Sequence, residues 1–195
     1  MHITKFMMVG ALGLIMALTG CRSTQEVLKI GEAGETNPGP CPRAFSLHDA
    51  QRFVDFKGDG RQTFGNVGFT GEIGKIRSLC RYFGEQPIRA DLTMQMDFGR
   101  GPAAESASYT YQYWVAVTRK NIAVINKQTF PLTVTFPAGA DRVSLVESID
   151  EIIIPRAGEN TSGENFEIIV GFEVDPQQRD FNAEGRRFRV SAGQN

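Results

Sequence analysis

His48 lies directly before Asp49, and this pair is the first candidate for chemistry in the sequence. A histidine oriented by a carboxylate can act as a general base, but hydrolysis also needs a nucleophile for that base to activate. The chain has no G-x-S-x-G motif, and the segment "NTSGEN" at residues 160–165 does not fit that nucleophile elbow. The pair is therefore interpreted as a polar surface pair, and the sequence predicts no catalytic residues and no enzyme.

Two groups of acidic residues could bind a metal or act as paired carboxylates. In "DFKGDGRQTFGN", residues 55–66, Lys57 and Asn66 occupy the third and twelfth positions, where a calcium loop needs an oxygen ligand and a bidentate glutamate. A hairpin turn is the better interpretation. Glu147, Asp150 and Glu151 lie close in sequence, but adjacent strand residues point to opposite faces, so a solvated strand edge is favoured. We expect no metal and no cofactor.

Four aromatic residues lie in one stretch, "SYTYQYWVAV". Tyr109, Tyr111 and Tyr113 share one face of a predicted strand, and Trp114 lies on the other face. Such spacing suits stacking on a sugar ring or on a partner protein, which makes all four candidate ligand-binding residues. The competing interpretation, which is favoured for the three tyrosines, is that they fill the core of the domain.

Cys21 follows an apolar stretch that has the features of a signal peptide. Lys5 gives it a positive start, and Phe6 to Leu18 are apolar but too few to span a bilayer. The segment Leu18-Thr19-Gly20-Cys21 resembles the bacterial lipobox. The resemblance implies that residues 1–20 are removed, that Cys21 carries lipid, and that the first partner of the chain is a membrane.

The residues after Cys21 indicate where the protein resides and how its domain is attached. Residue 22 is Arg rather than Asp, which by analogy with enterobacterial lipoproteins favours the outer membrane, facing the periplasm. Residues 21–40 are rich in polar residues, Gly and Pro, and read as a flexible tether. The domain itself is expected over residues 41–190.

Cys41 and Cys80 remain once Cys21 is assigned to lipid. In an oxidising cell envelope such a pair is expected to form a disulfide. Metal binding is the competing interpretation, but the spacing does not suit it, and His48 is the sole histidine after residue 20. The formal net charge is −1 and no basic stripe is present, so no nucleic-acid partner is expected.

Period-two alternation of apolar residues runs through most of the predicted domain. It is clearest in "IRADLTMQMDFG" at 88–99, and it recurs in "NFEIIVGFEV" at 165–174. A parity switch beside Gly74 predicts a bulged strand, and "DPQQRDFNAEG" at 175–185 predicts a short C-terminal helical turn. The pattern predicts an all-β, antiparallel β-sandwich, with an immunoglobulin-like layout as one arrangement and a small barrel as the alternative.

Several segments together are similar to a group of small uncharacterised lipoproteins from alphaproteobacteria: "CPRAF", "LCRY", "YQYWVAV", "KQTF", "VTFP" and "EIIVGFEVDPQQRDFN". The resemblance implies a lipoprotein and no particular activity. We therefore expect a membrane-tethered binding or scaffolding domain for envelope proteins. The alternative is a module that binds glycan or peptidoglycan.

Overall fold

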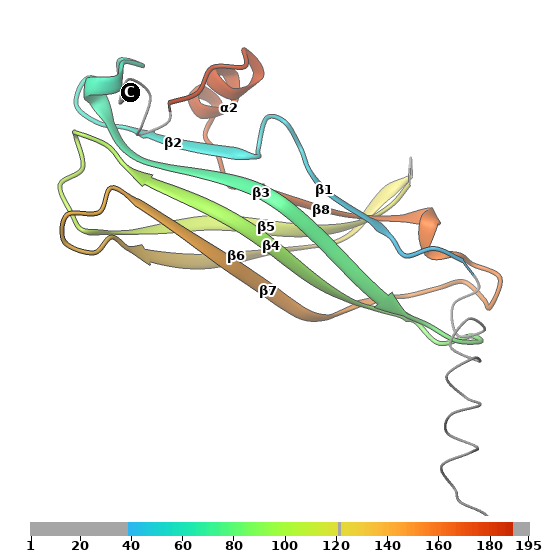
Figure 1. Ribbon diagram of the computed structural model, residues 1–195. Helices are drawn as coiled ribbons and strands as arrows, with labels where there is room; N and C mark the ends of the chain where they lie inside the picture. Colours follow the sequence, from blue (N-terminus) through green and yellow to red (C-terminus); the bar gives the residue numbers. More distant parts are fainter. Residues whose placement is uncertain (1–38, 121, 189–195) are drawn as a thin grey trace, which may run out of the picture. The chain divides into compact units, whose positions relative to one another are not determined.

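Two β-sheets of four strands each form the domain in the computed structural model, which describes residues 39–120 and 122–188 (Figure 1). The first sheet has the order β1-β8-β5-β6 and the second β2-β3-β4-β7. β1 and β8 pair in parallel, and the other pairings of the described strands are antiparallel. The strands are β1 Arg43–Ser46, β2 Arg52–Phe56, β3 Val67–Arg81, β4 Ile88–Arg100, β5 Ser108–Arg119, β6 Ala123–Thr135, β7 Arg142–Ile154 and β8 Phe166–Phe172.

The predicted β-sandwich is confirmed, because the two sheets pack their apolar faces against each other around one large core. Its strand order departs from the immunoglobulin order, in which the first, second, fourth and fifth strands share a sheet. Here the consecutive strands β2, β3 and β4 are neighbours, and β7 joins them at the edge. Cys21 and the predicted signal peptide lie outside the described residues.

Strand alternation explains the core. Side chains of a strand point to opposite faces in turn, so every second residue of β4 reaches the interior while the residues between them face outward. β8 contributes the same pattern from the other sheet. The buried residues of these two strands are Ile88, Ala90, Leu92, Met94, Met96 and Phe98 on β4, and Phe166, Ile168, Val170 and Phe172 on β8.

β3 carries the predicted bulge. Its register against β4 shifts between Ile73 and Ile76, so the core-facing residues change from odd to even numbers at that point. Gly74 lies within the shift, as the sequence indicated. The bulge lets one strand of 15 residues keep its apolar side on the core along its whole length.

The C-terminal helix α2, Pro176–Ala183, has the predicted boundaries. Asp175 is the N-cap and forms a capping box with Gln178, and Gly185 follows the helix with φ at 72°. Side-chain amides hold the helix on β2: Gln178 donates to the Val54 carbonyl at 2.8 Å, and Asn182 donates to the Arg52 carbonyl at 2.7 Å. None of the helices in the described ranges is both long enough and apolar enough to span a bilayer.

Two devices fix the start of the domain at one end of the sandwich. A disulfide joins Cys41 to Cys80 near the end of β3, with Cα atoms 5.6 Å apart, which is the expected pairing. The buried Tyr82 hydroxyl donates to the Gly39 carbonyl at 2.6 Å and accepts the Gly163 amide at 3.1 Å. The first described residues of the domain are therefore held in place both by a covalent bond and by hydrogen bonds.

Candidate functional site

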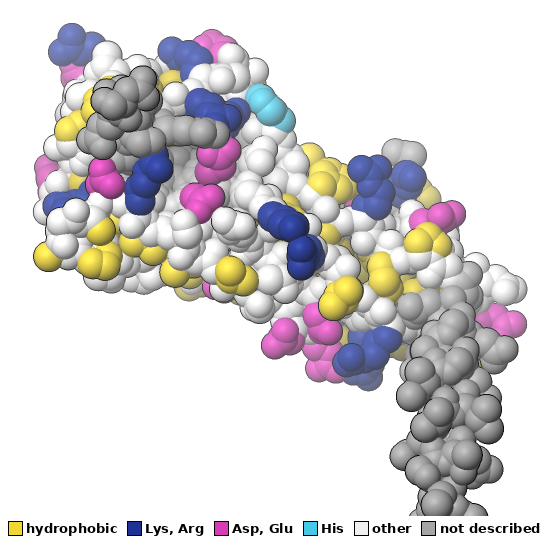
Figure 2. Space-filling view, in the orientation of Figure 1, with side chains coloured by type: hydrophobic (Ala, Val, Ile, Leu, Met, Phe, Trp, Pro, Cys, Tyr) yellow, Lys and Arg dark blue, Asp and Glu magenta, His cyan; other side chains and the backbone are white. Residues whose placement is uncertain are grey.

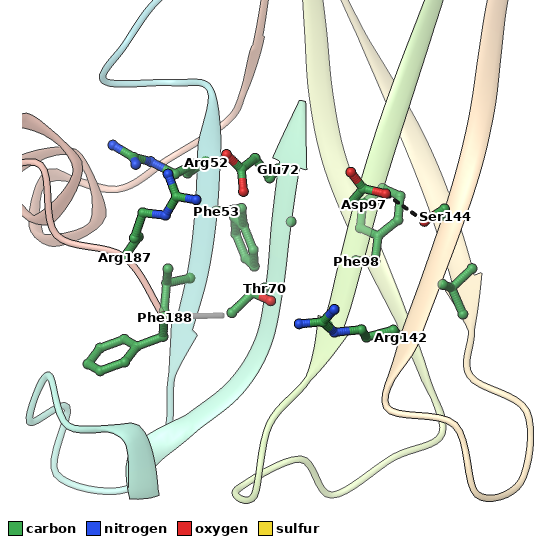
Figure 3. A pocket seen from close by; sticks show the side chains of 14 residues that line it. Arg52, Phe53, Thr70, Glu72, Asp97, Phe98, Arg142, Ser144, Arg187 and Phe188 are labelled. Carbon is green, nitrogen blue, oxygen red and sulfur yellow. Dashed lines mark hydrogen bonds between the residues drawn. The ribbon is translucent and has the colours of Figure 1, made fainter. Parts of the chain in front are cut away.

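A hollow of about 340 Å³ lies on the outer face of the β2-β3-β4-β7 sheet, near the α2 end (Figure 3). Two rows of residues in register across the four strands form most of its lining. The volume is at the lower end of the range for small-molecule sites. From β2 to β7, the first row is Arg52, Glu72, Asp97 and Ser144, and the second row is Val54, Thr70, Gly99 and Arg142.

Two features form the hollow: a glycine in its floor, and residues after α2 that lie along β2 as its side wall. Gly99 lies between Thr70 and Arg142 in the second row, so nothing projects from β4 there. The wall consists of Arg187 and Phe188, which follow α2 in the chain. The Phe188 ring turns away from the hollow in Figure 3 and stacks on Phe181 of α2, with ring centroids 5.5 Å apart.

Glu72 and Asp97 place two carboxylates side by side in the hollow. They are directly opposite each other in the β3–β4 register, an arrangement that destabilises a sheet when the charges are alike. Asp97 accepts a hydrogen bond from the Ser144 hydroxyl at 2.5 Å. Within the described ranges, Glu72 has no hydrogen bond or salt bridge of its side chain. A cationic group between the two carboxylates would relieve this repulsion.

Arg52 supplies a buried positive charge at the edge of the hollow. Only 9% of this residue is exposed, and it lies opposite Glu72 in the β2–β3 register. Its guanidinium contacts the Asn182 carbonyl at 3.5 Å and His48 Nε2 at 3.4 Å. Its buried Nε has no partner among the described residues. Burying a charge with so few hydrogen bonds is costly, which is typical of a functional position.

Two further arginines face the same space. Figure 3 shows that Arg142 extends from β7 across β4 toward Thr70, and that the guanidinium of Arg187 lies beside that of Arg52. Figure 2 shows acidic and basic side chains gathered on this face near the α2 end. The hollow therefore offers carboxylates, guanidinium groups and hydroxyls at short range, a set that can bind a ligand carrying both signs of charge. Among the described residues, no group of three or more potential metal ligands occurs.

The hollow and the start of the domain lie at opposite ends of β3. Gly71 lines the hollow and Cys80 is in the disulfide, nine residues further along the same strand. At about 3.3 Å per residue, roughly 30 Å separate the two. A binding event in the hollow would therefore take place at the end of the sandwich away from the disulfide.

A second recess, of about 410 Å³, opens between the edge strands β6 and β7. Its inner walls are aliphatic and aromatic side chains, including Val115, Phe130 and Ile149. Asn126 and Gln128 are exposed at its β6 side. Its polar groups are thus at the rim, whereas in the hollow they line the floor.

The three tyrosines proposed as ligand-binding residues are core residues, and this part of the prediction is wrong. Tyr111 and Tyr113 are 0% and 1% exposed, and Tyr109 stacks on Phe69 with ring centroids 4.7 Å apart. Their face of β5 is the inner face of the sandwich, so the favoured interpretation, that they fill the core, holds. The Tyr111 hydroxyl donates across the core to the Thr70 carbonyl at 3.0 Å.

Trp114 lies on the outer face of β5, as predicted, but it is already covered by the protein itself. Its Nε1 donates to the Phe172 carbonyl at 3.1 Å, and the ring lies against Gly171, where a Cβ would come within 2.5 Å of it. The Lys127 ammonium lies 4.8 Å from the ring centroid. A ligand could stack on this ring only if Lys127 moved, so Trp114 is not a preformed stacking platform.

Buried tyrosines give the protein a pH dependence at alkaline pH. Burial raises the pKa of Tyr111 above its usual 10.0, and burial together with the hydrogen bond to Glu147 raises the pKa of Tyr113. Above pH 10 these groups lose protons in the unfolded chain but keep them in the folded one. The contribution of these tyrosines to the unfolding free energy is therefore fully present below pH 10. It is lost as the pH rises further, at about 1.4 kcal/mol per pH unit for each such tyrosine.

Urea unfolding between pH 8 and pH 11.5 tests this dependence. We expect Tyr113→Phe to be less stable than the parent at pH 8, because it loses the 2.9 Å hydrogen bond to Glu147. The difference should shrink as the pH approaches 11, since phenylalanine does not ionise. A constant difference at every pH would contradict the proposed cause.

The other candidates for chemistry make local contacts. His48 and Asp49 form an exposed pair, with Nδ1 and Oδ1 3.4 Å apart. In the loop at residues 55–66, Asp59 accepts from the Arg61 amide at 3.1 Å, so the turn is closed by its own side chain. Glu147 turns inward to Tyr113, while Glu151 lies in the strand irregularity with φ at 62° and pairs with Arg89.

The charged residues of the hollow were not among the predicted site residues. Glu72, Asp97 and Arg142 are 25 or more residues apart in sequence, and each is an ordinary outward position on its own strand. Only the strand register brings them together. The available signal was the alternation itself, which places each of them on the polar face.

Comparisons with protein families, with curated proteins and with solved structures found no match to this chain.

Proposed function

We propose that this chain is a lipid-anchored protein of a bacterial cell envelope, and that its β-sandwich is a binding domain for other envelope components rather than an enzyme. The observation that carries the binding role is the hollow, where Glu72 and Asp97 face each other and the buried Arg52 lies alongside. Charges held together in this way leave interactions for a ligand to complete.

The anchor half of the proposal is supported by the lipobox-like segment ending at Cys21 and by the disulfide. Disulfides persist in oxidising compartments such as the periplasm. Acyl chains on Cys21 would confine the domain to a thin layer at the membrane and raise its effective concentration toward partners there. The fixed start of the domain, roughly 30 Å from the hollow, would leave the site accessible.

In-cell crosslinking of the full chain and of Cys21→Ala tests both halves. We expect the parent to incorporate labelled palmitate, to fractionate with membranes and to capture a reproducible set of envelope proteins. Cys21→Ala should lose the label and the membrane fraction, because no other residue of the lipobox-like segment has a thiol.

Ser23→Ala, two residues further on, is the matched control and should behave like the parent. Persistent labelling of Cys21→Ala would refute the anchor. Recovery of glycan without protein would favour the alternative, a glycan or peptidoglycan module.

A further inference from the structure

We infer that the hollow on the β2-β3-β4-β7 sheet binds a small zwitterion that carries a primary ammonium group and a carboxylate, namely the two ends of a dipeptide or a compound of that size. The inference rests on the binding role proposed above and names the ligand class for that site. It does not depend on the lipid anchor.

The ammonium position is defined by Glu72 and Asp97. Their side chains stand on the same face of neighbouring strands, directly opposite each other, where Cβ atoms are about 4.5–5.5 Å apart. An ammonium group has three donors and a single positive charge. Placed between these carboxylates, it would donate to both and replace a repulsive pair with two charge-assisted hydrogen bonds.

The carboxylate position is defined by the arginines. Arg142 lies one diagonal step from Asp97, since Asp97 is opposite Ser144 and Gly99 is opposite Arg142. Diagonal neighbours have Cβ atoms roughly 7–8 Å apart, and Arg142 extends across β4 toward Thr70 (Figure 3). A guanidinium has five donors in a planar fork, so it can accommodate a ligand carboxylate in addition to contacts it already makes.

The spacing and size select the ligand. The strand positions that carry the two kinds of charge have Cβ atoms about one diagonal step, roughly 7–8 Å, apart, which is further than the ammonium and carboxylate of a single α-amino acid. Consecutive Cα atoms are 3.80 Å apart, so the termini of a dipeptide can reach both positions. The volume of about 340 Å³ admits a ligand of this size.

The buried Arg52 supports the same conclusion independently of the carboxylates. It is nine-tenths buried, lines the hollow, and has an Nε without a partner among the described residues. An anionic group at the β2 side of the hollow would satisfy it. The three arginines around two carboxylates give the lining a small positive excess that favours an extra anion on the ligand.

The Phe188 ring packs against Phe181 and away from the hollow, and the Phe53 and Phe98 rings are buried in the core. The described lining therefore offers no exposed aromatic face, which is the feature a stacked sugar ring needs. The groups of the lining that can recognise a ligand are therefore its charged side chains.

Titration calorimetry on the full chain in detergent tests the inference with four probes: Ala-Ala, N-acetyl-Ala-Ala, Ala-Ala amide and chitobiose. We expect Ala-Ala to bind. Acetylation removes the ammonium and amidation removes the carboxylate, so each should weaken binding by about ten-fold or more. Chitobiose should not bind.

Variants locate the site. Glu72→Gln and Asp97→Asn should each weaken Ala-Ala binding by about ten-fold without lowering the urea midpoint, because both residues face outward and each substitution removes the repulsion between the two carboxylates. Glu105→Gln, an exposed loop carboxylate outside the hollow, is the matched control and should bind like the parent. Binding of Ala-Ala that is insensitive to Glu72→Gln and Asp97→Asn would overturn the site.

Failure of the ligand class can be told apart from failure of the binding role. If no dipeptide binds, or if the acetylated probe binds equally well, the zwitterion inference is overturned. If Glu72→Gln and Asp97→Asn still lose the envelope proteins captured by crosslinking, the hollow keeps its binding role with another ligand. If capture also survives both substitutions, the proposed role of the hollow fails as well.

Discussion

Replacing both Cys41 and Cys80 with alanine is expected to lower the unfolding free energy by about 4 kcal/mol, a large part of the stability of an ordinary domain. The bridge closes a loop with a sequence separation of 39 residues. In the chain-entropy account, this closure removes conformations from the unfolded chain and leaves the folded state unchanged. For a domain of this size, about 4 kcal/mol corresponds to a fall in Tm of roughly 8–16 °C.

The consequence is local as well as global, because the bridge holds the start of the domain. Without it, the segment at Gly39 and Pro40 is held by the Tyr82 hydroxyl, at 2.6 and 3.1 Å from the two carbonyls. Each such hydrogen bond contributes about 1 kcal/mol. The segment before β1 should therefore exchange its amide hydrogens faster in the double variant, while the β4 core should keep its relative protection.

Urea unfolding followed by the fluorescence of Trp114, the single tryptophan, measures the effect. Dithiothreitol should lower the midpoint of the parent toward that of the double alanine variant and leave the variant itself unchanged. Equal midpoints for the parent and the variant would show that the Tyr82 contacts suffice to fix the start of the domain.

The strands and the sandwich could be predicted from sequence because burial of one sheet face imposes a period of two. β4 shows this most directly, since its six core residues alternate with polar ones, and a slip of one residue would reverse both faces. The bulge at Gly74 could be found for the same reason, as a change of parity within a single strand. Local capping chemistry at Asp175 and Gly185 set the ends of α2.

The start of the domain was harder to predict. The segment 45–56, "FSLHDAQRFVDF", reads as one short strand or helix, with a strand favoured. The structure divides it between β1 and β2, which belong to different sheets. The turn at Leu47–Ala50 makes this crossing, closed by the Ala50 amide, which donates to the Leu47 carbonyl at 3.0 Å. A chain can cross from one sheet to the other only where each sheet has an unpaired edge strand, and which strands are at the edges depends on the whole fold.

The candidate site could not be predicted from the sequence, for a related reason. Alternation assigns Glu72, Asp97 and Arg142 to polar faces, but three strands must align before two carboxylates and an arginine become neighbours. The same ambiguity affected β5, where aromatic residues at alternate positions suit either a core or an exposed stacking surface. In the structure the second sheet covers this face of β5, so the aromatic residues lie in the core.

Phe172→Ala is expected to lower the unfolding free energy by about 3–5 kcal/mol, the range for removing a buried aromatic ring. Phe172 is fully buried on β8, and its ring meets the opposite sheet at Phe53 and Phe98, with centroids 6.1 and 6.3 Å away. It also fills the space beneath Gly71, where an added Cβ would lie 2.9 Å from the ring. Gly71 lines the hollow, so the ring supports the floor of the candidate site from below.

Two companion variants separate the cavity from other effects of the substitution. Phe172→Leu keeps most of the buried volume and should cost less than half as much, because the cost rises with the size of the cavity left behind. Ile169→Ala, on the same strand but half-buried, should also cost less than Phe172→Ala. If Phe172→Ala unfolds at the same urea concentration as the parent, the sheets do not pack through this ring. If Phe172→Ala is destabilised and also binds Ala-Ala more weakly, and Phe172→Leu recovers most of both losses, the same side chain holds the two sheets together and shapes the hollow.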